Sequence, residues 1–141
     1  MTARPPAEIR VPVHEECDVA VARARARALA REEGFPANRS EALATAISEI
    51  ARNIVVHAGA GEIVLATVIH RGRRGIRVVA RDDHPGIADV DRAMRDGYST
   101  RGGLGLGLPG ARRLVDEFTL ESAPGRGTTV TMTKWLHAVH R

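Results

Sequence analysis

Alternating apolar and polar residues open the chain and predict a short first strand over residues 8–13. Pro12 confines this strand to a sheet edge or a strand end, because proline has no N–H to donate to a neighbouring strand. The next segment is rich in alanine and arginine, which are strong helix formers without β-branched side chains. It predicts a helix with Asp18 as N-cap and Gly34 as C-cap.

A second helix is predicted over residues 39–58, because Asn38 and Glu41 have the spacing of a capping box and Gly59 supplies the exit. One of its faces is apolar and is expected to face the core: Leu43, Ile47, Ile50 and Ile54. A different face carries polar side chains four residues apart: Thr45, Glu49, Asn53 and His57.

The remaining pattern predicts two hairpins separated by helical segments. Residues 63–69 and 76–80 are β-rich and apolar, so we expect two well-buried strands joined by a turn over residues 71–75. A short helical piece is expected over residues 89–94, then a helix that carries Pro109 in its first turn and runs through Asp116, and a final hairpin of residues 118–122 and 128–133. These elements indicate one α/β domain over residues 1–141 with a mixed or mainly antiparallel sheet.

Composition agrees with one globular domain, since 43% of the residues are hydrophobic and 27% are charged. There is no apolar run long enough for a bilayer and no signal-peptide core, so we expect a soluble, cytoplasmic protein that does not bind membranes. Cys17 is the only cysteine, which excludes an internal disulfide. Its acidic neighbours should raise the pKa of its thiol and leave it inert.

The net charge of +4 does not indicate nucleic-acid binding, because the 21 lysine and arginine residues are scattered over the whole chain. Aromatic residues make up only 3% of the chain, too few for a set of base-stacking platforms. We therefore expect no nucleic-acid partner. We also expect no zinc, because four histidines lack metal-ligand spacing: His14, His70, His137 and His140.

Glycines recur from Tyr98 to Gly110 and lead directly into the helix that begins near Pro109. Glycine lets backbone N–H groups approach a ligand closely, and a helix N-terminus adds partial positive charge, so this stretch predicts a phosphate cradle. A P-loop and a eukaryotic-type protein kinase site are excluded, because each needs a lysine that Lys134 cannot supply from its position. Gly105 to Gly110 matches the dinucleotide fingerprint, but it does not directly follow a buried strand.

Four short boxes occur in a fixed order along the chain. They are Glu49-x3-Asn53 on a helix, Asp82-x3-Gly86 after a strand, Gly103-Leu-Gly-Leu-Gly107 before a helix, and Gly125-x-Gly-Thr128 at a hairpin. This order resembles the GHKL (Bergerat-fold) ATPases. Residues 48–55, 96–100, 103–111 and 113–118 are similar, more closely still, to the RsbT-like switch serine/threonine kinases of stressosome-type partner-switching modules.

The resemblance implies a two-layer sandwich of helices on a mixed, mainly antiparallel sheet, which binds ATP and Mg²⁺. It also implies a kinase that phosphorylates STAS-domain antagonist proteins on serine or threonine. Once released from them, such a kinase would bind and activate a PP2C-type phosphatase.

In that family match, Glu49 would be the general base or would orient the attacking hydroxyl, and Asn53 would hold Mg²⁺ through its amide oxygen. Asp82 would accept a hydrogen bond from the adenine amino group, with Gly86 allowing close approach of the ring and Thr128 assisting. The plainer alternatives are a solvated helix face for the first pair and an Asx turn for Asp82.

The phosphates would be met by backbone N–H groups of the glycine-rich box: Gly103, Leu104, Gly105, Leu106 and Gly107. Arg101 would add positive charge there or would be an exposed loop arginine. The chain departs from the superfamily at His84, which stands at the first glycine of the usual Asp-x-Gly-x-Gly box and bears on nucleotide affinity.

Three functions stay open on these residues. The first is the switch kinase; the second is an anti-sigma factor of the same fold that sequesters a sigma factor and phosphorylates its antagonist. The third is an ATPase or ATP-binding scaffold without a protein substrate.

Two further residues near the site have alternative roles. Arg52, next to Asn53, would touch phosphate or a partner's acidic group, and His57 would be a helix-end cap or a catalyst.

Overall fold

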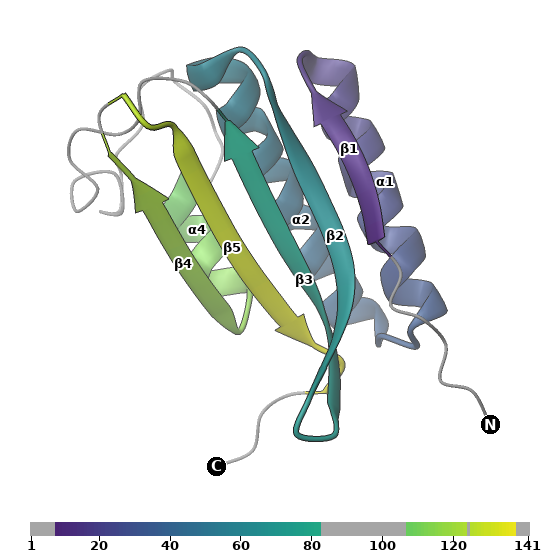
Figure 1. Ribbon diagram of the computed structural model, residues 1–141. Coiled ribbons are helices and arrows are strands. Elements are labelled where there is room, and N and C mark those ends of the chain that lie inside the picture. The colour runs from purple at the N-terminus through teal and green to yellow at the C-terminus, as the bar shows by residue number, and fades with distance from the viewer. Residues whose placement is uncertain (1–7, 83–106, 124, 138–141) are drawn as a thin grey trace.

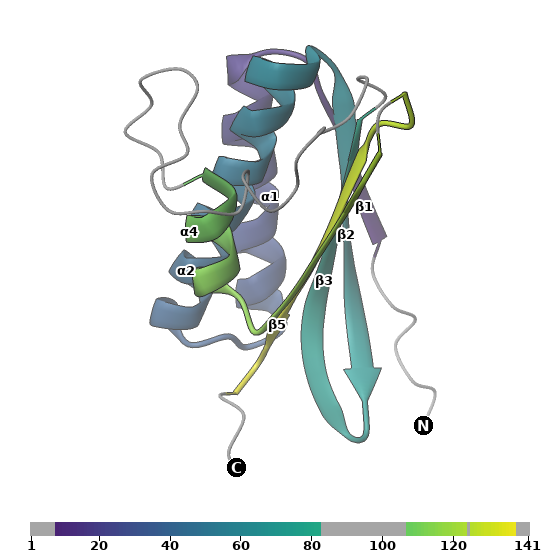
Figure 2. The same ribbon diagram turned by 90° about the vertical axis from the view of Figure 1, so that its left-hand side faces the viewer.

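In the part of the chain that the structure describes, a five-stranded sheet carries three helices on one of its faces (Figures 1 and 2). The computed structural model describes residues 8–82, 107–123 and 125–137. The strands are β1 (Glu8–Val13), β2 (Gly61–His70), β3 (Arg73–Asp82), β4 (Glu117–Ser122) and β5 (Thr128–Trp135), in the sheet order β1-β2-β3-β5-β4. The helices are α1 (Glu16–Glu32), α2 (Ala37–Asn53) and α4 (Gly107–Leu114), with the π-helical turn η1 (Ile54–Ala58) after α2.

Each pair of neighbouring strands in the described residues is antiparallel, which confirms the predicted α/β fold and its mainly antiparallel sheet. Strand β1 has the predicted bounds and lies at the sheet edge, where Pro12 does not interrupt the hydrogen-bond ladder. Within the described parts of the chain, no helix has the length and apolar character needed to cross a membrane.

Helix α1 begins earlier than predicted. Its N-cap is Glu15, and Asp18 lies in the first turn, where its Oδ2 atom accepts the backbone N–H of His14 at 2.8 Å and of Glu15 at 3.1 Å. The predicted N-cap role of Asp18 is therefore wrong, although its carboxylate does satisfy N–H groups at the helix start. The helix ends at Glu32 with Glu33 as its C-cap, so the predicted C-cap, Gly34, lies one residue too far along, where it leaves the helix with a positive φ of 85°.

Helix α2 also begins before its predicted start, because Pro36 has a φ of −59° and its carbonyl already accepts the Ser40 N–H at 2.9 Å. The Asn38–Glu41 capping box is therefore wrong. The predicted core stripe is confirmed, since its four residues are at most 3% exposed: Leu43, Ile47, Ile50 and Ile54. Regular α-helix ends at Asn53, after which Gly59 donates to Ile54 O at 2.8 Å across five residues.

Strands β2 and β3 form a tight hairpin through Arg71 and Gly72, both of which have positive φ (52° and 78°). Both strands are longer than predicted, and the expectation that they are well buried is wrong for one face. The side chains that face the helices include the fully buried Ile63 and Leu65, whereas the opposite face has no covering helix in the described residues (Figure 2).

Helix α4 begins at Gly107 and contains the buried Pro109 in its first turn, as predicted. It ends at Leu114, two residues before the predicted end, because the Asp116 carboxylate bonds to other elements instead of continuing the helix. Its Oδ2 atom accepts the backbone N–H of Trp135 and Nη2–H of Arg39, each at 2.7 Å. The helical piece expected over residues 89–94 lies outside the described residues.

Candidate functional site

Five of the predicted site residues lie in the described ranges, on elements that meet at one end of the molecule, uppermost in Figure 1. Helix α2 and strand β3 end there, whereas α4 and β5 begin there. The five residues are Glu49, Asn53, Asp82, Gly107 and Thr128. Six further predictions lie outside the described residues: Gly86, Arg101, Gly103, Leu104, Gly105 and Leu106.

Glu49 lies on α2 and is buried against the first residue of α4. Its Oε2 atom accepts the backbone N–H of Gly107 at 3.2 Å, and its side chain is only 12% exposed. The carboxylate therefore stands at the positive end of α4, directly beside the segment expected to bind phosphate. The plainer interpretation of Glu49 as part of a solvated helix face does not fit this burial.

Arg52 is the second group on the Glu49 carboxylate. Its Nη1 atom lies 3.5 Å from Glu49 Oε1, and its Nε atom lies 3.6 Å from Glu16 Oε1 on α1. The guanidinium is thus shared between two carboxylates from different helices. At these distances the attraction of each pair is modest, but the two together restrict where the half-exposed Arg52 side chain lies.

Asn53 is the last residue of α2 and is half-buried, one helical turn after Glu49. The predicted polar row stops here, because His57 lies in the wider π-helical turn η1 and is exposed. A π-helix places more residues in each turn than an α-helix, so the four-residue spacing no longer keeps side chains in line. His57 therefore does not continue the row of Thr45, Glu49 and Asn53.

Asp82 ends β3 between two neighbouring strands, opposite Gly61 on β2 and Thr128 on β5. The backbone of Gly61 comes so close to β3 and η1 that an added Cβ would clash with Arg81 O and would lie 2.9 Å from Ile54 Cγ2. It would also lie 3.2 Å from Asp82 Cβ. Gly61 thus allows both η1 and the end of β3 to lie close to the start of β2.

Thr128, at the start of β5, is held by the adjacent strand. Its Oγ1 atom lies 2.9 Å from Ser122 Oγ, which also lies 3.2 Å from the carbonyl oxygen of Gly127. The Thr128 hydroxyl is therefore oriented by the β4–β5 hairpin and lies in the same cross-strand row as Asp82.

Two further residues belong to this end of the molecule, although the sequence interpretation did not include them. Glu16 reaches Arg52 from α1, and Ser122 orients Thr128. Ser122 could have been found from the hairpin register once the β4–β5 turn was predicted. Glu16 carries no comparable sequence signal, because the α1–α2 packing that brings it to Arg52 is a tertiary contact.

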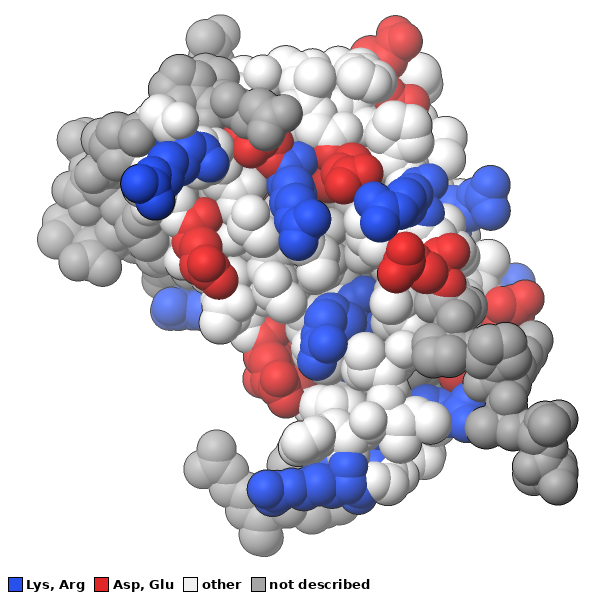
Figure 3. Space-filling model, viewed as in Figure 1, with Lys and Arg blue, Asp and Glu red and all other residues white. Residues whose placement is uncertain are grey.

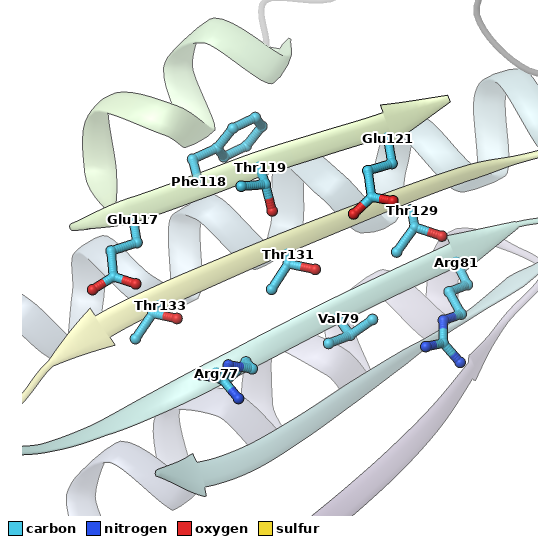
Figure 4. A pocket seen from close by; sticks show the side chains of 10 residues that line it. All are labelled: Arg77, Val79, Arg81, Glu117, Phe118, Thr119, Glu121, Thr129, Thr131 and Thr133. Atoms are coloured by element: carbon cyan, nitrogen blue, oxygen red, sulfur yellow. The ribbon is translucent and has the colours of Figure 1, made fainter. Parts of the chain in front are cut away.

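Two shallow hollows lie on the surface of the described residues. One, of about 500 Å³, is on the open face of the sheet, between arginines of β3 and glutamates of β4 with threonines of β5 along its floor (Figure 4). Basic and acidic side chains are interspersed over this face (Figure 3). The other, of about 590 Å³, lies between α1 and α2 and reaches Arg52. None of the predicted site residues lines either hollow.

The far end of α4 is tied to β5 by Lys134, whose Nζ atom donates to Leu114 O at 2.7 Å. Partial burial lowers the pKa of Lys134, and the nearby Arg39 acts in the same direction, whereas Asp116 opposes them. This ammonium satisfies a carbonyl at the last residue of the helix whose first residue contacts Glu49. Lys134 thus helps to place α4 relative to the sheet.

Cys17 is exposed on the first turn of α1. Desolvation is the largest cause that raises the pKa of its thiol, and the charges of Glu15 and Asp18 raise it further. The expected direction is confirmed, with desolvation as an additional cause. In residues 8–82, 107–123 and 125–137, no three His, Cys, Asp or Glu side chains gather as a metal site would require.

Comparison with known proteins shows to which family the chain belongs. The family model described as "Histidine kinase-like ATPase domain" matches residues 11–134. The serine/threonine-protein kinase RsbT of Bacillus subtilis (strain 168) is 47% identical over 89% of this chain and 95% of its own. An anti-sigma F factor of Caldanaerobacter subterraneus subsp. tengcongensis is 36% identical over 65% of this chain and 67% of its own.

Among solved structures, the RsbU and RsbW domains of Rv1364c from Mycobacterium tuberculosis superpose with a TM-score of 0.63 and 25% sequence identity. The superposition covers 93% of this chain and 32% of that longer one. The chain therefore belongs to the histidine kinase-like ATPase domain family, as an RsbT-like member of it.

Proposed function

We propose that the protein is an ATP-dependent serine/threonine kinase of a partner-switching module. The observation that carries this proposal is the contact between Glu49 Oε2 and the N–H of Gly107, which puts a buried carboxylate beside the start of α4. A general base must lie close to the transferred phosphoryl group, and a helix N-terminus is where phosphate binds. The 47% identity to a protein named as a serine/threonine-protein kinase supports the same activity.

The donor set fits a magnesium nucleotide. Asp82 offers a carboxylate to the adenine amino group, with Thr128 beside it, and the N–H of Gly107 is the last of the amides that we assign to the phosphates. Gly86 would let the adenine ring approach closely. The other phosphate contacts in the proposal come from the box of Gly103, Leu104, Gly105 and Leu106, with Arg101 adding charge.

Asn53 is the residue that we assign to Mg²⁺, through its amide oxygen. Magnesium is commonly held by one or two protein oxygens together with substrate phosphates, so it does not need a cluster of acidic residues. When bound, the ion neutralises charge on the phosphates. Glu49 then takes the proton of the attacking hydroxyl or orients that hydroxyl, which requires only that its carboxylate stay ionised and correctly placed.

The substrates that we propose are STAS-domain antagonist proteins, and the second partner is a PP2C-type phosphatase that the released kinase binds and activates. The test is incubation of the purified protein with γ-labelled ATP, Mg²⁺ and the STAS proteins of its own genome. We expect label on a serine or threonine of one of them. Glu49→Gln should abolish this transfer while ATP still binds, whereas the matched variant Glu41→Gln, exposed on α2, should transfer normally.

Full transfer by Glu49→Gln would refute the assigned base. ATP turnover without label on any STAS protein would favour the ATPase or scaffold function instead.

A second function, an anti-sigma factor that phosphorylates its own antagonist, is supported by the 36% identity to an anti-sigma F factor. Affinity capture from the source cells separates the two. Recovery of a STAS protein or a phosphatase would support the switch kinase. Recovery of a sigma factor, without either of them, would overturn it in favour of the anti-sigma factor.

A further inference from the structure

Both oxygens of the Glu49 carboxylate are engaged, and by groups of different kinds. Oε2 accepts a backbone N–H, that of Gly107 at 3.2 Å, whereas Oε1 faces the guanidinium of Arg52 at 3.5 Å. With 12% of the side chain exposed, bulk water has little access to replace either contact. The position of this carboxylate is therefore set by two protein groups that sit on different elements, α4 and α2 itself.

The two contacts differ in whether a nucleotide would compete for them. The N–H of Gly107 is one of the phosphate-binding amides in the proposed function, and a backbone amide has a single proton to donate. A phosphate oxygen at a helix N-terminus is a strong, charged acceptor, at least as good as a carboxylate at 3.2 Å. Glu49 and phosphate therefore cannot both hold the N–H of Gly107.

We propose that nucleotide phosphate displaces Glu49 from the N–H of Gly107, so that ATP binding itself frees the Oε2 atom for the acceptor hydroxyl. Arg52 acts as a positioning residue, because it stays on Oε1 and keeps the carboxylate at the site while Oε2 changes partner. The inference rests on the proposed kinase function and adds to it a coupling between nucleotide binding and placement of the base.

The reaction that follows is an ordinary phosphoryl transfer. The acceptor oxygen forms a bond to the γ-phosphorus, the bond from that phosphorus to the β–γ bridging oxygen breaks, and ADP leaves with the electron pair. The acceptor proton passes to Glu49 Oε2. Since that oxygen is turned toward Gly107 until a phosphate takes its place, a partner hydroxyl meets the base only at a loaded site.

The test follows the amide proton resonance of Gly107 by NMR in the wild-type chain and in Glu49→Ala. Each protein is measured alone and with Mg²⁺ and the β,γ-imido analogue of ATP. Without nucleotide, loss of the carboxylate should move the resonance upfield. With the analogue bound, the two proteins should give the same resonance, because phosphate then holds the N–H in both.

A control variant, Glu41→Ala, removes an exposed glutamate from the same helix and should leave the resonance unchanged in both conditions. Glu49→Gln, which preserves the packing, covers the case that the alanine variant does not fold, and should give a smaller shift in the same direction. Equal resonances without nucleotide, or a difference that persists with the analogue bound, would overturn the inference while leaving the kinase function intact. Failure of the wild-type chain to bind the analogue would overturn both.

Arg52 is tested separately by steady-state kinetics. If it positions Glu49, Arg52→Gln should lower kcat between about 10- and 100-fold with little change in the KM for ATP. Arg52→Lys should restore part of the loss, since an ammonium can also pair with Oε1. A rise in the KM for ATP with unchanged kcat would assign Arg52 to phosphate binding and overturn its positioning role.

Discussion

Replacing Lys134 by methionine should loosen α4 while preserving the apolar stem of the side chain. The Nζ atom donates to Leu114 O at 2.7 Å, and a hydrogen bond from a charged group contributes about 1.5–3 kcal/mol. The opposing effect is relief of desolvation, the main cause that lowers the pKa of Lys134. We expect a net loss of about 1–2 kcal/mol in the free energy of unfolding, which corresponds to a Tm lower by about 2–6 °C.

Thermal and urea unfolding followed by circular dichroism give the total loss, and hydrogen exchange shows where it arises. Exchange should accelerate more in α4 than in α1, because Lys134 contacts the last residue of α4. Arg126→Met, which removes an exposed cation from the β4–β5 turn, serves as the control and should change neither. Unchanged stability, or faster exchange spread evenly over all helices, would refute the anchoring role of Lys134.

Stability should also depend on pH through Lys134, because its folded pKa is below the ordinary value of 10.5. Between those two values the unfolded chain binds more protons, so wild-type stability should rise with pH, and Lys134→Met should lack this rise. A dependence of the same sign is expected in acid for Asp18, because the N–H groups of His14 and Glu15 lower its pKa: its stabilisation should be lost as the pH falls below 3.8, and Asp18→Asn should lack this loss. Gly61→Ala, whose added Cβ would crowd Ile54 and Asp82, should cost about 1–3 kcal/mol by urea unfolding and weaken nucleotide binding. Asp116→Asn, which keeps its shape but loses its charge beside Arg39, should lower stability by about 1–2 kcal/mol in the same assay.

Each of these has a result that would contradict it. A wild-type pH profile identical to that of Lys134→Met would show that this ammonium is not desolvated. Equal acid sensitivity of Asp18→Asn and wild type would remove the role of that carboxylate at the start of α1. Unchanged nucleotide affinity in a destabilised Gly61→Ala would separate the strand contact from the site, and full stability of Asp116→Asn would make its ion pair energetically neutral.

Hydrophobic periodicity predicted the elements well, because burial on one face is repeated over many residues. The stripe from Leu43 to Ile54 and the edge strand with Pro12 are of this kind. Helix starts were predicted less well, since each depends on one residue chosen among several capable neighbours. Glu15 serves as N-cap three residues before Asp18, and the carbonyl of Pro36 begins α2 before Asn38.

Only those features of the candidate site that depend on residues close together in the sequence could be predicted. Glu49 and Asn53 follow from a four-residue spacing on one helix, and Asp82 from the end of a strand. The contact of Glu49 with Gly107 joins residues 58 apart, and the bridge from Arg52 to Glu16 joins two helices. Neither leaves a pattern in the chain, because both depend on how α1, α2 and α4 pack on the sheet.

The π-helical turn η1 sets the number of residues between the end of α2 and the start of β2. Helix α2 must end with Asn53 beside Glu49, and β2 must begin with Gly61 opposite Asp82. A regular α-helical turn contains fewer residues than η1. If one residue were deleted from η1, the pairing of β2 with β3 would shift by one residue. Since neighbouring strand residues face opposite sides, that shift would turn Ile63 and Leu65 from the core to the open face. We therefore expect insertions and deletions in η1 to be harmful. They should be better tolerated at the exposed Arg71–Gly72 turn.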